Sequence, residues 1–389
     1  MIGLLAMVVL VGLGEKMAER FLPLYLMALG GGAVSVGLLN GLDNLLSALY
    51  SFPGGYLSDR LGTKRALLVF NLMAMTGFLV VILIPSWTAV IGGAVLFLSW
   101  TAISLPATMS LVARVLPRQK RTMGVTMHSL VRRLPMALGP VLGGLFISLW
   151  GIKDGVRLAF VVALVLAVVA LIMQQRLIED DPTNQEQDPA KPEKNPFKSF
   201  YLLSPALRRL LVSDILIRFC EQIPYAFVVI WCMRTIASPI GGFQFGLLTS
   251  IEMATAVLIY IPVAYLADRG TKKPFVVMTF VFFTFFPLIL LFCQSFWPLA
   301  AAFVLRGFKE FGEPTRKALI MDLAPEGRKA ATFGLYYLIR DTIVSLAAFG
   351  GAFLWLISPQ VNFLTAFACG AVGTIFFALK GRDLQAGGE

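Results

Sequence analysis

Hydrophobic residues occur in long runs along this chain. Apolar stretches of 18 or more residues alternate with short clusters of polar and charged residues. A helix that crosses the hydrocarbon core of a bilayer needs about 20 apolar residues. The pattern therefore predicts an all-α integral membrane protein with twelve transmembrane helices. We expect these spans at residues 2–29, 34–54, 66–85, 88–113, 124–150, 155–175, 207–235, 243–266, 274–293, 297–321, 331–356 and 360–379.

The composition excludes an ordinary water-soluble enzyme. Apolar residues make up 58% of the chain and charged residues 14%, with a mean hydropathy of +0.80, whereas soluble domains carry roughly 25% charged residues. The sequence contains no nucleotide-binding loop, no cluster of metal ligands and no nucleophile constellation. We therefore expect no enzymatic activity, no catalytic residue, no metal and no cofactor.

The net charge of +11 is explained mainly by topology. Of the loop Lys and Arg residues, 22 lie on one side of the predicted membrane and 3 on the other, and the more basic side is cytoplasmic. Both termini then face the cytoplasm, and the lack of glycosylation sequons favours a bacterial inner membrane. The charge therefore implies no nucleic-acid partner.

An internal repeat divides the chain into two homologous halves. Residues 37–60 align with residues 246–269 at an offset of 209, and after Leu61 the offset becomes 208 through charged and proline positions. The acids Asp43 and Glu252 coincide in this alignment. A polar, proline-containing stretch separates the halves. The repeat predicts a six-helix bundle at 1–176, a cytoplasmic linker at 177–206 and a second six-helix bundle at 207–389.

The segment from Gly55 to Arg65 resembles the signature Gly-x-x-x-Asp-Arg/Lys-x-Gly-Arg/Lys-Arg/Lys, which lies between the second and third helices of the major facilitator superfamily. Thr63 stands at the first basic position, and the degenerate second copy has Ala264 in place of glycine. The resemblance implies that family's fold and a secondary transporter that works by alternating access. It also implies a gating role, since the family's loop Asp helps to hold the halves together in the outward-facing state. The residues with this implied role are Gly55, Asp59, Arg60, Gly62, Lys64, Arg65, Asp268 and Arg269.

The fifth predicted span carries Gly139, Pro140, Gly143 and Gly144, which resemble the core of the motif typical of antiporters in that family. Small residues allow close helix approach, so Gly139 and Pro140 join the gating candidates, although a generic packing face is the alternative. The resemblance favours proton-coupled efflux of a small organic solute or drug. One alternative is a symporter or facilitator that imports an anionic or zwitterionic metabolite. Another is a lipid flippase or a non-transporting sensor.

Charged residues inside the spans are expensive and usually functional. They comprise nine acids and eight cations, and the resemblance implies that spans one, four, seven and ten line a central cavity. Desolvation can let a carboxylate take up a proton in one conformation and release it in another, although fixed ion pairs between helices are the alternative. Our candidates for proton coupling are Glu19, Glu221, Glu310, Glu313, Asp43 and Glu15. Our candidates for substrate binding are Arg20, Arg132, Arg218, Arg306 and Trp100.

The expected partners follow from these assignments. They are a small-molecule substrate, protons, and membrane lipids that contact the basic cytoplasmic loops. We expect the protein to be a monomer.

Overall fold

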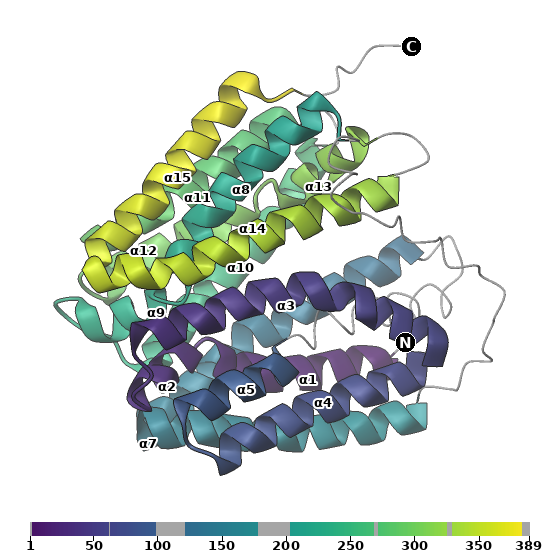
Figure 1. Cartoon of the computed structure of the whole chain (residues 1–389), viewed down its shortest axis with the longest axis vertical. Coiled ribbons are helices and arrows are strands. Elements are labelled where there is room, and N and C mark those ends of the chain that lie inside the picture. Colours follow the sequence, from purple (N-terminus) through teal and green to yellow (C-terminus); the bar gives the residue numbers. More distant parts are fainter. Residues whose placement is uncertain are drawn as a thin grey trace.

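The computed structural model describes residues 2–61, 63–98, 121–177, 203–267, 271–324 and 329–382. These residues are almost entirely helical and contain no strand (Figure 1). The first half contains α1 (Ile2–Glu19), α2 (Leu22–Ala28), α3 (Gly32–Leu61), α4 (Thr63–Leu83), α5 (Trp87–Phe97) and α7 (Arg121–Leu177). The second half contains α8 (Pro205–Tyr225), α9 (Val228–Ile230), a π-helical turn (Trp231–Thr235), α10 (Gly242–Ala267), α11 (Lys273–Phe292), α12 (Phe296–Gly307), a 3-10 turn (Phe308–Glu310), α13 (Glu313–Asp322), α14 (Lys329–Ile357) and α15 (Pro359–Lys380).

The described helices form twelve rods once short helices that continue one another are joined. The long helix α7 contributes two of them, because Gly151 adopts φ 79° and reverses the chain; glycine populates this left-handed region without steric cost. Among the described residues, six helices are long and apolar enough to cross a membrane, and a pair bent by 41° makes a seventh. The predicted all-α membrane fold with two six-helix bundles is confirmed.

Proline interrupts two rods that the hydrophobic pattern predicts as continuous spans. Helix α1 ends at Glu19, four residues before Pro23, because a proline ring clashes with the carbonyl group four residues earlier. In the second half, Pro224 lies at the end of α8, and the chain bends by 41° before α9. The predicted span 297–321 is likewise broken, by the turn at Phe308–Glu310. The hydropathy of the sequence alone does not reveal where such helices are broken.

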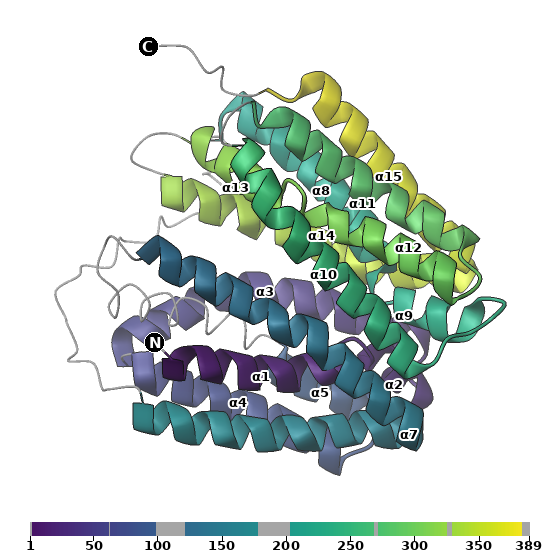
Figure 2. The ribbon, with the colours of Figure 1, turned by 180° about the vertical axis from the view of Figure 1, so that it is seen from behind.

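The two halves lie side by side and contact each other along two helix pairs. Helix α3 packs against α14, and the first part of α7 packs against α10. We call the end of the bundle where α1 begins and α15 ends the terminal end, and the opposite end the distal end. Figures 1 and 2 show both helix pairs converging at the distal end and diverging toward the terminal end. The halves are therefore closed together at the distal end.

Glycines allow the close approach of the halves, and the repeat accounts for their positions. A Cβ atom on Gly246 of α10 would lie 2.7 Å from Cα of Val141, and a Cβ atom on Gly37 of α3 would lie 2.9 Å from the carbonyl oxygen of Phe349. Residues 37 and 246 are equivalent in the two repeats. Each half therefore contributes the same glycine to a different seam.

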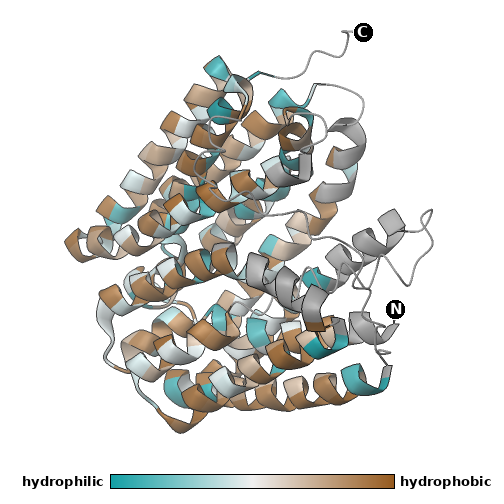
Figure 3. Cartoon of the chain, turned by 45° about the vertical axis from the view of Figure 1, so that its right-hand side comes forward, coloured by the Kyte–Doolittle hydropathy of each residue, from teal (hydrophilic) through white to brown (hydrophobic). Residues whose placement is uncertain are grey.

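Hydrophobic residues predominate along the helices (Figure 3), and many large ones are exposed. Trp297 and Phe292 are 79% and 77% exposed, while Asp214 and Glu252 are fully buried. A soluble protein has the opposite arrangement. The exposed apolar surface therefore faces lipid, and the charged residues Asp214 and Glu252 lie away from it.

The distal seam yields a prediction. Gly246→Val should push α10 away from α7, because the added side chain overlaps the backbone at Val141. Spin labels at Leu83 and Ile357, which are 69% and 70% exposed at the distal ends of α4 and α14, should report a longer distance between the halves.

The matched control is Gly350→Val, because a Cβ atom at Gly350 has no neighbour within 4 Å. Identical distance distributions for the two variants would show that the seam does not set the spacing of the halves.

Candidate functional site

A cavity of about 510 Å³ lies between the two halves. Its polar wall comes from the points at which the first and seventh rods break, where Glu19, Arg20 and Tyr225 are located, and from Asp43 and Arg306. The full lining is Glu19, Arg20, Leu22, Pro23, Leu39, Asn40, Asp43, Leu98, Tyr225, Ala226, Val228, Val229, Phe245 and Arg306. The cavity thus combines two carboxylates and two guanidinium groups with a largely apolar remainder.

Arg20 lines this cavity and forms no direct ion pair with any residue that the structure describes. Its guanidinium carbon lies 5.1 Å from the ring centroid of Tyr225, and that of Arg306 lies 5.7 Å from the same centroid. A cation over an aromatic face is attracted by the ring quadrupole. In the described part of the chain no carboxylate lies within ion-pair distance of Arg20, whereas neighbouring Glu19 is paired with Lys16. Arg20 can therefore accept an anion from outside the protein.

Asp43 and Glu252 occupy equivalent positions in the repeats but have different surroundings. Glu252 is fully buried and is paired with Arg306 at 3.3 Å and Lys309 at 3.1 Å. The repeat offset of 208 places Leu98 and Thr101 at the positions of those two cations. As a result, Asp43 has no ion-pair partner among the described residues. Of the two carboxylates on the cavity wall, Glu19 is paired with Lys16, and Asp43 is the one that contacts no cation in the described ranges.

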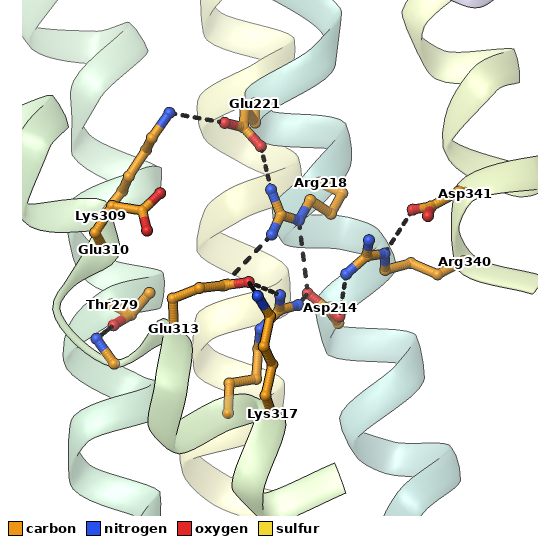
Figure 4. A network of polar contacts seen from close by, with 12 residues as sticks. Asp214, Arg218, Glu221, Thr279, Lys309, Glu310, Glu313, Lys317, Arg340 and Asp341 are labelled. Atoms are coloured by element: carbon orange, nitrogen blue, oxygen red, sulfur yellow. Dashed lines mark hydrogen bonds and ion pairs between the residues drawn. The ribbon is translucent and has the colours of Figure 1, made fainter. Parts of the chain in front are cut away.

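A network of buried ion pairs lies beside the cavity in the second half (Figure 4). Asp214 is contacted by Arg316, by Arg340 at 3.4 Å and by the hydroxyl group of Tyr336 at 3.0 Å. Arg218 reaches Glu221 at 2.6 Å and Glu313 at 3.5 Å.

Further contacts extend the network. Arg316 contacts Glu313 at 2.7 Å, and Lys309 contacts Glu221 at 3.1 Å. These charges neutralise one another and hold α8, α13 and α14 together.

Arg316 corrects the sequence-based count of loop cations. The count places it on the cytoplasmic surface, yet its side chain is 1% exposed within α13. A cation near the end of a span can either enter a loop or turn inward, and hydropathy does not distinguish the two. The overlooked signal was its spacing of three residues from Glu313, which continues the charged helix face formed by Arg306, Glu310 and Glu313.

Polar contacts also cross between the halves near the cavity. Arg133 of α7 pairs with Glu310 at 3.1 Å. The side-chain amides of Asn40 and Asn44 donate to the backbone and side-chain oxygens of Gln222 at 2.9 and 3.2 Å. Any motion of one half relative to the other has to exchange these contacts for others.

The remaining charged candidates are separated from the central cavity or engaged elsewhere. Glu15 contacts Lys16 at 3.1 Å, and both line a smaller cavity of about 280 Å³ together with Arg132. Arg218, Glu221 and Glu313 belong to the buried network described above, and Glu310 to the contact between the halves. Trp100 lies outside the described residues. The structure thus brings Glu19, Arg20, Asp43 and Arg306 together and leaves their predicted roles as predictions.

The gating candidates fall into two groups. Cβ atoms on Gly139 and Gly246 would lie within 3 Å of the Lys16 and Pro140 backbones respectively, so the glycine motif is packed between α1 and α10. At the terminal end, the carbonyl group of Lys64 accepts a hydrogen bond from the buried Gln174 at 3.0 Å, and Arg65 is exposed. The side chains of Asp59 and Arg60 and the surroundings of Gly55 lie outside the described part, as do Gly62, Asp268 and Arg269.

The sequence analysis did not select Tyr225 or Asn40, although both line the cavity. The available signals were Pro224, which places a helix break beside Tyr225, and the spacing of Asn40 three residues before Asp43 on α3. A polar residue one helical turn from an intramembrane acid shares its face.

Comparison with known proteins agrees with this architecture. The family model described as Major Facilitator Superfamily matches residues 4–242 and 215–386. The uncharacterised MFS-type transporter MJ1317 of Methanocaldococcus jannaschii is 25% identical over 363 residues, which are 90% of this chain and 87% of that protein.

Two solved structures share the fold. A mutant of the nucleoside transporter NupG has a TM-score of 0.82 at 12% identity, with 97% and 99% of the two chains covered. The peptide transporter POT in complex with sulfate has a TM-score of 0.78 for a mutant at 15% identity, with 97% and 92% covered.

The buried network yields a second prediction. Asp214→Ala would leave Arg316 and Arg340 without their shared carboxylate, and breaking a buried ion pair costs about 3–5 kcal/mol. We expect the free energy of unfolding, measured by denaturant titration in detergent micelles, to fall by about that amount.

Lys317→Ala is the control, because Lys317 contacts Glu313 at 3.6 Å but is 52% exposed. Exposed pairs contribute about 1 kcal/mol or less. Equal losses for the two variants would contradict a stabilising role for the network.

Proposed function

Because this chain belongs to the Major Facilitator Superfamily, we propose that it transports a small organic anion or zwitterion across the membrane together with a proton. Secondary transport in this fold proceeds by rocking of two halves around a site between them. The observation that carries the proposal is a pair of groups on the cavity wall, Arg20 and Asp43, neither of which forms an ion pair within the described part of the chain.

Arg20 supplies the binding group for the substrate. A guanidinium group offers a planar fork of donors that matches carboxylate, sulfonate or phosphate oxygens. Arg20 shares the lining of the central cavity with Asp43 and Arg306. The apolar wall of the cavity, which includes Leu39 and Phe245, suits the hydrocarbon part of an organic solute.

Asp43 supplies the proton site through charge balance. Glu19 is paired with Lys16, and Arg306 with Glu252, so in the empty cavity the charges of Arg20 and Asp43 offset each other. An anion bound at Arg20 adds an uncompensated negative charge, which is costly in a low-dielectric site. A proton on Asp43 removes that cost. The anion and the proton therefore favour each other's binding, and this coupling drives symport.

Proton-driven efflux is the second candidate, and the glycine motif favours it. Gly139 and Pro140 pack at the meeting point of α1, α7 and α10, where they can guide the sliding of one half on the other. A cationic substrate would compete with the proton for Asp43, and competition of that kind produces exchange. Proton-driven efflux thus predicts a cationic substrate, whereas symport predicts an anionic one.

The loop charges indicate the direction in which the cavity opens. If the basic loops at the terminal end face the cytoplasm, the divergence of the halves toward that end corresponds to an inward-facing state. Exposed Arg65 then lies where anionic lipid headgroups are available.

Transport into proteoliposomes distinguishes the two candidates. The probes are 3-phenylpropanesulfonate, a permanent anion, and 3-phenylpropyltrimethylammonium, a permanent cation with the same tail. We expect a proton gradient directed into the vesicles to accelerate uptake of the sulfonate. Arg20→Gln should abolish this uptake by removing the binding group. Asp43→Asn should retain exchange of sulfonate across the membrane but lose accumulation driven by the gradient.

Lys317→Ala serves as the matched charge-removal control and should transport normally. If the gradient instead accelerates efflux of the loaded cation, the efflux candidate is correct and the symport proposal is wrong. Proton coupling through Asp43 would be contradicted if the rate of sulfonate uptake changed neither with the proton gradient nor with the Asp43→Asn substitution.

A further inference from the structure

A second cavity adjoins the central one within the second half. Its volume is about 310 Å³, and it shares Tyr225, Val228 and Arg306 with the central cavity. The rest of its lining is Cys220, Glu221, Phe282, Phe283, Phe286 and Lys309. The shared residues make the two cavities neighbours.

The charged groups of the second cavity are already neutralised. Glu221 pairs with Arg218 at 2.6 Å and with Lys309 at 3.1 Å, and Lys309 also pairs with Glu252 at 3.1 Å. Arg306 pairs with the same Glu252. Since each of these charges has a counter-ion, the second cavity offers nothing that selects a charged ligand. It differs in this respect from the central cavity, where Arg20 has no ion-pair partner among the residues that the structure describes.

Aromatic rings form the free surface of the second cavity. Phe282, Phe283 and Phe286 come from α11, and Tyr225 faces them from the end of α8. The guanidinium carbon of Arg306 lies 4.9 Å from the ring centroid of Phe286, which holds that ring at the boundary between the cavities. Aromatic rings favour edge-to-face and offset contacts with another ring.

We propose that the second cavity binds an aromatic or bulky apolar tail of the transported substrate while its anionic group is bound at Arg20. This inference rests on the proposed function and narrows its substrate class to amphipathic organic anions. Tyr225 then separates the two parts of one ligand. Small hydrophilic anions would fill only the central cavity and bind more weakly.

Binding measurements with two sulfonates that share a head group test the inference. We expect 3-phenylpropanesulfonate to bind the purified protein at least tenfold more tightly than propanesulfonate, by isothermal titration calorimetry. Phe282→Ala and the conservative Phe286→Leu should each raise the Kd of 3-phenylpropanesulfonate at least threefold. Both should change the Kd of propanesulfonate less than twofold. Phe285→Ala is the matched control, because Phe285 is on the same helix but is 43% exposed on its outer side and should change neither affinity.

A measurement on the unmodified protein covers the case in which a Phe variant misfolds. A phenylpropanesulfonate that carries a diazirine on its ring should cross-link to Phe282, Phe283 or Phe286 of α11 or to Tyr225, as mapped by mass spectrometry. Cross-links confined to other helices would overturn the inference.

The outcomes separate the inference from the proposed function. If Arg20→Gln weakens both sulfonates but the phenyl tail adds no affinity, the tail site is wrong and the anion site stands. If the Phe variants and Phe285→Ala behave alike, the tail site is again wrong. If neither sulfonate binds, or if Arg20→Gln has no effect on either, the proposed function itself fails, and the inference fails with it.

Discussion

The rest of this structure depends on the requirement that charge buried in a bilayer be neutralised where it lies. The second half meets it by placing Asp214, Arg316 and Arg340 in contact and by adding Arg218, Glu221 and Glu313 around them. Because these pairs lie within one half, rocking of the halves does not disturb them. The ion pair of Arg133 with Glu310, which does cross between the halves, is partly exposed. The buried charges of the second half thus hold that half together, whereas the pair of Arg133 with Glu310 joins the two halves.

Duplication followed by divergence accounts for the charges that remain. Glu252 has two cationic neighbours on the tenth rod, whereas Leu98 and Thr101 stand at the equivalent sequence positions of the first repeat. The difference between the repeats gives Glu252 two ion-pair partners and leaves Asp43 without one among the described residues. The break at Pro23 then places Arg20 beside it. Chemistry in this cavity follows from the places where the two halves differ.

The sequence predicted the twelve rods, the two halves and the family, because long apolar runs and a constant repeat offset are properties of the chain itself. It did not predict which charges are paired. Spacing along one helix placed Arg218 and Glu221 on a common face, but the partners of Asp214 come from α13 and α14, and the packing of those helices is not encoded in local periodicity. Arg316 was assigned to a loop for the same reason. The sequence analysis ranked Asp43 below Glu19 as a candidate for proton coupling. Only the structure shows that Glu19 is paired with Lys16.

The most direct test of this account is the number of protons taken up when an anion binds. Isothermal titration of 3-phenylpropanesulfonate into the detergent-solubilised protein, repeated in two buffers of different ionisation enthalpy, measures that number, because the sulfonate itself does not titrate. The account predicts uptake of about one proton per bound anion by the unmodified protein and none by Asp43→Asn. Binding without proton uptake, or equal uptake by both proteins, would contradict it.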